Sequence, residues 1–290
     1  MKGGVKEMNN DNLNLFLMHI RAKGSENTAR DYEKNIKRFF SECKKAEKDV
    51  KYEDLLIYYN ENLQHLKLNS KRAYMIAVIS YFKFLYQQDK LEKDITKSFK
   101  MPQAELKDME YLGTKEALMV SRACDYEVQN KLRKKAMFVM FVNAGMRASE
   151  LANLELEDIK DEWIIIKKGK GRKFRTIPLH PSVKEAIDLY IKYERRSRSP
   201  YLFVNRYGNR LTNSIINRDL DRIVGSAHID KNITAHRLRD SFATIQYING
   251  ADIKSIQETL GHTNIQMTLH YVQKADEKRR DQVVKAGVQF

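Results

Sequence analysis

Residues 163–179 read WIIIKKGKGRKFRTIPL, and this stretch decides the fold class. Two runs of apolar and β-branched residues flank a short basic segment that contains Gly169 and Gly171. Such a pattern favours two antiparallel strands joined by a tight turn. In most other segments the apolar residues recur at intervals of three and four, which is typical of helices. We therefore predict a mainly α-helical protein with one small antiparallel β-sheet or hairpin in its second half.

The first ninety residues contain four segments with apolar residues at helical spacing. The fourth segment follows Asn69 and Ser70, which we predict to be its N-caps. The four sets are Leu13, Phe16, Leu17 and Ile20; Tyr32, Ile36, Phe39 and Phe40; Leu55, Leu56 and Tyr59; and Tyr74, Ala77, Val78, Tyr81, Phe82 and Leu85. They predict a compact helical module with Lys and Arg on its outer faces.

The chain of 290 residues is long enough for two domains. We predict a helical domain over residues 8–90 and a linker over 91–110, which is dense in charge, lacks periodicity and contains a proline. A second domain over 111–275 and a C-terminal helix or tail over 276–290 complete the organisation.

Helices of the second domain are expected to begin at capping residues. Ser182, Thr212 and Thr234 are the candidate N-caps after the hairpin. Gly261 is expected to end a helix, and Thr263 to cap the next one.

Composition predicts a polyanion as the partner. There are 53 Lys and Arg against 38 Asp and Glu, a net charge of +15 spread along the chain. The mean hydropathy is −0.61, and no long apolar run or signal peptide is present, so we expect no membrane partner and a cytoplasmic location. Two isolated cysteines, Cys43 and Cys124, argue against a disulfide framework or a Cys-based zinc site.

Four local features carry residues suited to phosphate chemistry, yet each alone has an ordinary explanation. Taken singly, the four features can be explained by a surface arginine, a basic loop that touches the DNA backbone, a hydrogen-bonded histidine and a core tyrosine. The features are Arg147 after Gly145 in NAGMRASEL; Lys168, Lys170, Arg172 and Lys173 in the hairpin turn; His236 and Arg239 in TAHRLRDSF; and His262 and Tyr271 in LGHTNIQMTLHYVQ.

Together and in this order, the four features resemble the tyrosine recombinase (phage integrase) family. The resemblance covers nearly the whole chain: a helical module, a linker, and then Arg, a hairpin Lys, His-x-x-Arg, Gly-His and Tyr. It implies a two-domain architecture, in which an α-helical SAM-like core-binding domain precedes a DNA breaking-rejoining catalytic domain. Two positions depart mildly from the family pattern: Met146 stands where leucine is usual, and Asp240 where histidine is frequent.

The resemblance also implies a role for each matching residue. Lys170 is preferred over its basic neighbours because it lies between the two turn glycines, and Glu150, in the Arg-x-x-Glu-Leu pattern, is expected to orient Arg147. The resemblance implies that Tyr271 is the nucleophile and that Arg147 and Arg239 form the phosphate clamp. It also implies that Lys170 is the acid that protonates the leaving 5′ oxygen and that His236 and His262 are supporting donors.

This chemistry needs neither a metal nor another cofactor, because guanidinium groups neutralise the phosphate oxygens. Metal-dependent strand transfer is the chemical alternative, and it would need a carboxylate cluster. The acidic residues near the site are interpreted as a solvated loop before the hairpin: Glu155, Glu157, Asp158, Asp161 and Glu162.

The implied function is site-specific DNA recombination through a covalent 3′-phosphotyrosine and a Holliday junction, on double-stranded DNA, by a tetramer that holds two duplexes. Only about ten residues precede the first predicted helix, which resembles the short Xer type that resolves chromosome dimers at a dif-like site, in association with the nucleoid. The alternatives are an integrase or excisionase of a mobile element, a type IB topoisomerase, and a non-catalytic sequence-specific DNA-binding protein.

The C-terminal segment suggests how protomers hold one another. Residues 276–290 begin as a basic stretch and end with a small apolar set, Val283, Val284, Val288 and Phe290. We hypothesise that this set docks on the next protomer in a ring of four, while packing on its own domain is the alternative.

Overall fold

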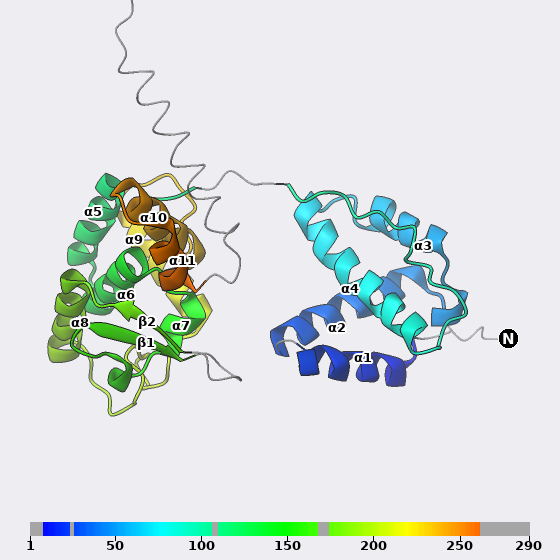
Figure 1. Cartoon of the computed structure of the whole chain (residues 1–290), viewed down its shortest axis with the longest axis horizontal. Helices are drawn as coiled ribbons and strands as arrows, with labels where there is room; N and C mark the ends of the chain where they lie inside the picture. Colours follow the sequence, from blue (N-terminus) through cyan, green and yellow to red (C-terminus); the bar gives the residue numbers. More distant parts are fainter. Residues whose placement is uncertain (1–7, 24–25, 106–109, 168–173, 262–290) are drawn as a thin grey trace, which may run out of the picture. The chain divides into compact units, whose positions relative to one another are not determined.

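The computed structural model describes residues 8–23, 26–105, 110–167 and 174–261. The chain divides into two compact units, Met1–Lys107 and Asp108–Phe290 (Figure 1). Each unit has its own hydrophobic core, so each is described by itself. Within the described residues, no helix combines the length and the apolar character that crossing a bilayer requires.

The first unit is helical, as predicted from the spacing of its apolar residues. Phe16, Phe39 and Tyr81 lie in its core, each at most 1% exposed, and Phe39 packs edge-on against Tyr58 with ring centroids 4.9 Å apart. The elements are α1 (Asn10–Lys23), α2 (Glu26–Cys43), the short 3-10 helix η1 (Glu47–Asp49), α3 (Tyr52–Ile57), the π-helical turn η2 (Tyr58–Asn62) and α4 (Leu68–Gln87).

Residues 91–105, within the predicted linker, pack in part against the first unit. Leu91, Ile95 and Phe99 contact its core, and the Phe99 ring lies 5.9 Å from the ring of Tyr59. These three side chains recur every fourth residue, a helical spacing, yet the segment forms bends and turns and no helix.

The second unit packs helices around α6, beside a two-stranded sheet (Figure 1). Helix α6 contacts α5, α8, α9 and α10. Most of its residues are buried, because from Ala136 onward the helix is apolar on nearly every side. The elements are α5 (Thr114–Ala123), η3 (Cys124–Tyr126), α6 (Lys131–Ala144), α7 (Ala148–Ala152), η4 (Leu156–Asp158), β1 (Trp163–Lys167), β2 (Phe174–Pro178), α8 (Pro181–Tyr193), α9 (Asn213–Ser226), α10 (Ala235–Ile248) and α11 (Ile253–Leu260).

The predicted hairpin strands are confirmed. Strands β1 and β2 are antiparallel, with Ile164 opposite Ile177 and Ile166 opposite Arg175. Ile164, Ile166 and Ile177 are buried, so one face of the ribbon joins the core. Its turn, residues 168–173, lies outside the described residues.

Three of the predicted helix ends are confirmed. The side chain of Thr212 accepts a hydrogen bond from the backbone N–H of Ile215 at the start of α9, and Thr234 accepts one from Arg237 at the start of α10. Gly261 ends α11 in the left-handed conformation, with φ at 64°. Thr263 lies outside the described residues.

Three predicted N-caps are wrong. Helix α4 begins at Leu68, so Asn69 and Ser70 both lie in its first turn. The Asn69 side chain exchanges two hydrogen bonds with the backbone of Glu105. Helix α8 begins at Pro181, because proline fits the first helical position, and His180 accepts the hydrogen bond from the backbone N–H of Ser182.

Gly145 ends α6 and allows close packing at the centre of the second unit. Its φ is 58°, a left-handed conformation that strains residues with a Cβ. A Cβ at this position would lie 2.8 Å from Cε1 of Phe242 in α10 and 2.9 Å from a methyl group of Leu260 in α11. The absence of a side chain therefore lets α10 and α11 approach the end of α6.

We expect Gly145→Ala to lower the free energy of unfolding by about 2–4 kcal/mol, because it combines left-handed strain with overpacking. Urea denaturation measures this change. Gly225→Ala is the matched control, since Gly225 lies in α9 with nothing within 4 Å of a Cβ, and we expect it to stabilise by about 0.5–1 kcal/mol. Equal effects of the two substitutions would contradict this account.

Candidate active site

Three of the six predicted site residues are in the described part of the chain. Arg147, His236 and Arg239 lie in the second unit, on α10 and at the start of α7. Lys170, His262 and Tyr271, the other three, lie outside the described residues. The geometry below therefore concerns the two arginines, one histidine and the groups that contact them.

Arg147 is the N-cap of α7, two residues beyond the glycine that ends α6. The carboxylate of Glu150 accepts hydrogen bonds from the backbone N–H of Arg147 at 2.8 Å and from its guanidinium at 2.9 Å. This is the acidic half of a capping box. The predicted contact between Glu150 and Arg147 is therefore present, and the Arg147 side chain remains 39% exposed.

Arg239 lies on α10 with a side chain that is only 2% exposed. Its guanidinium donates to the backbone carbonyl of Gly145 at 2.6 Å and to that of Leu260. These bonds tie α10 to the ends of α6 and α11, where helix carbonyls lack partners within the helix. The cation is also well placed electrostatically, because the C-terminal end of a helix carries partial negative charge.

Glu150 gathers a third arginine, Arg175, which the sequence analysis did not select. The two terminal nitrogens of Arg175 donate to the two carboxylate oxygens of Glu150 at 2.7 and 2.8 Å. The nearest guanidinium nitrogen of Arg239 is 4.0 Å from the same carboxylate. Three guanidinium groups thus surround one carboxylate, which leaves the cluster with a net positive charge.

The alternation of residues along β2 contains a signal for Arg175. Residues two apart on a strand share a face, so Arg175 shares the face of the buried Ile177. A charged residue on the apolar face of a strand needs a buried partner, because an isolated charge in the protein interior is costly. Its partner, Glu150, is 25 residues away and could not be identified by spacing.

The cluster shifts the ionisation of Glu150. Burial alone would raise its pKa, but the hydrogen bonds and charge of Arg175, together with Arg147, outweigh burial and lower the pKa to about 2. Glu150 is consequently ionised at neutral pH, and it compensates part of the positive charge of the arginines.

His236 occupies the first turn of α10 and is exposed. It precedes Arg239 by three residues, which places the two on neighbouring positions of one helix face, as the sequence predicted. The two departures from the family pattern are both buried: Met146 is 0% exposed, and Asp240, at 1%, pairs with Arg237 at 3.3 Å.

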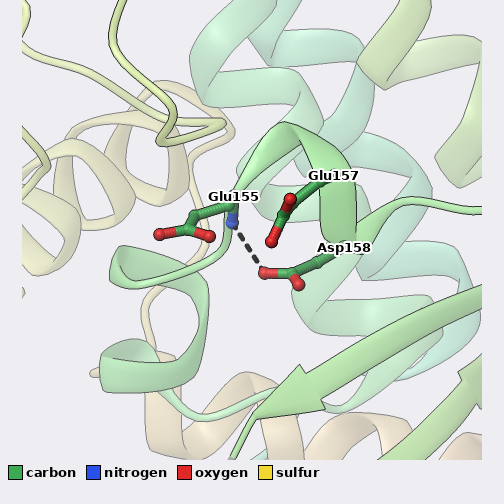
Figure 2. Close-up of side chains that lie close together, drawn as sticks. All are labelled: Glu155, Glu157 and Asp158. Carbon is green, nitrogen blue, oxygen red and sulfur yellow. Dashed lines mark hydrogen bonds between the residues drawn. The ribbon is translucent and has the colours of Figure 1, made fainter.

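The acidic stretch before the hairpin is not simply a solvated loop. Glu155, Glu157 and Asp158 bring their carboxylates together at η4, and the backbone N–H of Glu155 donates to Asp158 at 3.0 Å (Figure 2). Asp158 is 3% exposed. The expectation of a solvated loop is therefore wrong for Asp158, because this carboxylate folds back onto the backbone.

A lysine already supplies the positive charge for these carboxylates. The ammonium of Lys167, at the end of β1, lies 2.9, 2.7 and 2.8 Å from oxygens of Glu155, Glu157 and Asp158. Asp158 first, and then the two glutamates, raise the pKa of Lys167 above its ordinary value. Arg147 and Lys167 line one cleft of about 280 Å³, so this acidic cluster lies beside the arginine cluster and holds the end of β1.

Residues 110–278 match the phage integrase family, and residues 13–89 match the N-terminal SAM-like domain of phage integrases. The chain belongs to the tyrosine recombinase (phage integrase) family. The protein is therefore a site-specific recombinase. The predicted fold is confirmed: a SAM-like unit precedes a catalytic unit that contains a two-stranded antiparallel sheet.

Curated relatives match almost the full length of the recombinase. Tyrosine recombinase XerA of Pyrococcus horikoshii is 32% identical over 99% of this chain and 97% of its own. Tyrosine recombinase XerD of Halalkalibacterium halodurans is 29% identical over 94% of this chain and 96% of its own.

Solved structures of recombinases share the fold. A crystal structure of XerA recombinase has a TM-score of 0.55 and 25% identity over 97% of this chain and 100% of that one. A lambda integrase dimer bound to a COC′ core site has a TM-score of 0.75 over 90% of this chain and 94% of that one, with 16% identity.

The lowered pKa of Glu150 makes part of the stability dependent on pH. A carboxyl with a depressed folded pKa stabilises the fold above its unfolded pKa, near 4.5, and this contribution is lost as the pH falls through about 2. We expect the stability difference between the recombinase and Glu150→Gln to shrink by about 3 kcal/mol between pH 6 and pH 2. Urea denaturation at a series of pH values measures it.

Glu157→Gln is the control for this titration. Glu157 also pairs with a cation, but its side chain is 71% exposed, so water screens the interaction and the pH-dependent difference should be smaller. An equal pH dependence for both variants would show that the buried arginine cluster does not control Glu150.

Proposed function

We propose that the recombinase cleaves and rejoins double-stranded DNA at a specific site through a covalent 3′-phosphotyrosine formed by Tyr271, with strand exchange passing through a Holliday junction. The observation that carries the proposal is the cluster in which Glu150 gathers Arg147, Arg175 and Arg239. A cluster with net positive charge and fixed donors suits an anionic phosphodiester.

In this proposal, Arg147 and Arg239 form the phosphate clamp. Their guanidinium groups come from different segments, and both lie beside Glu150, at 2.9 and 4.0 Å. The nonbridging oxygens of the phosphodiester need fixed donors as the phosphorus becomes five-coordinate. A planar guanidinium supplies two parallel donors, and partial burial strengthens each interaction with the phosphate.

The attacking phenol poses a second problem, because a free tyrosine has a pKa of about 10. Holding it as a phenolate at pH 7 costs about 4 kcal/mol. We propose that the positive charge of the clamp offsets part of this cost and that His236 and His262 donate to the phosphate or accept the proton. Lys170 then protonates the leaving 5′ oxygen, and the ester to Tyr271 retains the bond energy for rejoining.

Among tyrosine recombinases we propose an Xer-like role, the resolution of chromosome dimers at a dif-like site. Relatives named XerA and XerD match nearly the whole chain, which supports this subclass. An XerH structure, bound in its crystal to a difH substrate, shares the fold with a TM-score of 0.70 and 22% identity over 93% of this chain and 83% of that one. Integration or excision of a mobile element is the alternative role.

We further propose a tetramer on two duplexes, in the cytoplasm and associated with the nucleoid. The net charge of +15 supports a nucleic acid as the partner. Both units would contact DNA, residues 8–90 as the core-binding domain and residues 111–275 as the catalytic domain, with the segment 276–290 joining protomers.

A covalent-adduct assay tests the nucleophile. The DNA is a chromosomal fragment of the source organism that the protein protects from nuclease, nicked beside the cleavage site so that a short strand diffuses away. In the presence of a chelator that removes metal ions, the recombinase should be trapped as a protein–DNA adduct. Tyr271→Phe should bind the fragment but yield at least about a thousandfold less adduct, because the attacking oxygen is missing.

Tyr193→Phe is the matched control, since it removes an exposed phenol from α8. It should form adduct at the normal rate. An adduct that persists in Tyr271→Phe would refute the assignment of the nucleophile. Specific binding without any adduct from the unaltered protein would favour the non-catalytic DNA-binding protein.

The proposed protomer contact predicts the effect of changing the apolar end of the tail. We expect Val283, Val284, Val288 and Phe290, replaced together by serine, to abolish synaptic complexes and strand exchange on native gels. Lys285→Ser, within the same segment, should preserve both. If the fourfold variant still assembles and exchanges strands, the tail packs on its own domain and the contact is made elsewhere.

A further inference from the structure

Arg175 joins three segments of the second unit that are far apart in the sequence. From β2 it holds both oxygens of Glu150 at 2.7 and 2.8 Å, and its Nε donates to the backbone carbonyl of Thr259 at 2.8 Å. Its side chain is only 9% exposed. One guanidinium therefore connects the hairpin, the start of α7 and the end of α11.

The contact with α11 is close as well as polar. A Cβ on Gly261 would lie 3.0 Å from Cδ of Arg175, and Gly261 has a φ of 64°. Arg239 donates to the next carbonyl, that of Leu260. Two buried cations thus hold consecutive carbonyls at the C-terminal end of a helix, where partial negative charge favours them.

Arginine is suited to this position for a geometric reason. Its planar fork can hold both carboxylate oxygens while the Nε–H points to a separate acceptor. A lysine has one nitrogen at the end of its chain and would have to divide it between Glu150 and Thr259. Without Arg175, Glu150 would keep a buried charge, and the cations left to compensate it within the described residues would be Arg147 and Arg239, the proposed phosphate ligands.

We propose that Arg175 is a positioning residue for the cleavage step. By holding both oxygens of Glu150 it leaves the remaining N–H groups of Arg147 and Arg239 available to the substrate phosphate, and by holding the Thr259 carbonyl it fixes the end of the helix that precedes His262 and Tyr271. This inference rests on the proposed function. Arg175 acts through these neighbours and does not itself contact the DNA.

The test measures single-turnover adduct formation at saturating DNA, DNA affinity and unfolding in urea for one set of variants. Arg175→Met should slow adduct formation about a hundredfold, the scale expected for a small misplacement of catalytic groups, and should change the Kd for DNA less than about threefold. Arg175→Lys should recover part of the rate. If Arg175→Met does not fold, Arg175→Lys tests the proposal alone: it should have near-normal stability and form adduct more slowly than the unaltered protein.

Arg195→Met is the control for a purely structural arginine. Arg195 belongs to the same unit and donates to the backbone carbonyls of Ser197 and Leu202 at 2.7 and 3.1 Å. Its loss should destabilise the protein but leave the rate at saturating DNA within about threefold. Comparable rate losses for Arg195→Met and Arg175→Met at equal stability would reduce Arg175 to a structural role, and a change confined to Kd would make it a DNA contact.

A double variant identifies the route of the effect. If Arg175 acts mainly through Glu150, adding Arg175→Met to Glu150→Gln should slow adduct formation less than about threefold further. Multiplicative losses in the double variant would overturn the route through Glu150.

Carboxyl NMR provides a readout that does not depend on activity. In Arg175→Met the Glu150 carboxyl should titrate at higher pH than in the unaltered protein, and in Arg195→Met it should not move. An unchanged titration in Arg175→Met would refute the inference even if adducts form. A shifted titration without any adduct from the unaltered protein would instead refute the proposed function.

Discussion

The ionised carboxylate of Glu150 is the constraint on which the arrangement of the second unit depends. Three guanidinium groups would repel one another without a negative charge between them. Glu150 supplies that charge, caps α7 through the backbone of Arg147 and accepts both terminal nitrogens of Arg175. Because it is mostly buried, its hydrogen bonds fix directions as well as distances. The result is a set of cations held in place before any substrate arrives.

This cluster depends in turn on packing that leaves no room for a side chain at Gly145. The end of α6, the middle of α10 and the end of α11 approach closely there, and Arg239 donates to the carbonyl of Gly145 itself. Backbone conformation, packing and charge are therefore coupled at one point. The carboxylates that pair with Lys167 have a separate role, since they hold the end of β1 on the exposed side of the same ribbon.

Spacing in the sequence predicted much of this organisation and failed where contacts were not local. The helical periods, the paired strands and the caps at Thr212 and Thr234 follow from residues a few positions apart, so local patterns contain the information. The proposed cap at Asn69 failed because its side chain bonds to Glu105, 36 residues away. Asp158 was predicted to lie in a solvated loop, because no local sequence pattern indicates its ion pair with Lys167.

The sequence by itself determined the family, the two kinds of unit and the order of Arg147, His236 and Arg239, because motifs and apolar periods are properties of neighbouring residues. Only the tertiary structure decided that Arg175 joins them and that Glu150 lies between the three arginines. The physical reason is distance along the chain: Arg175 meets Glu150 across 25 residues and Thr259 across 84. Such contacts exist only after the helices and the ribbon have packed.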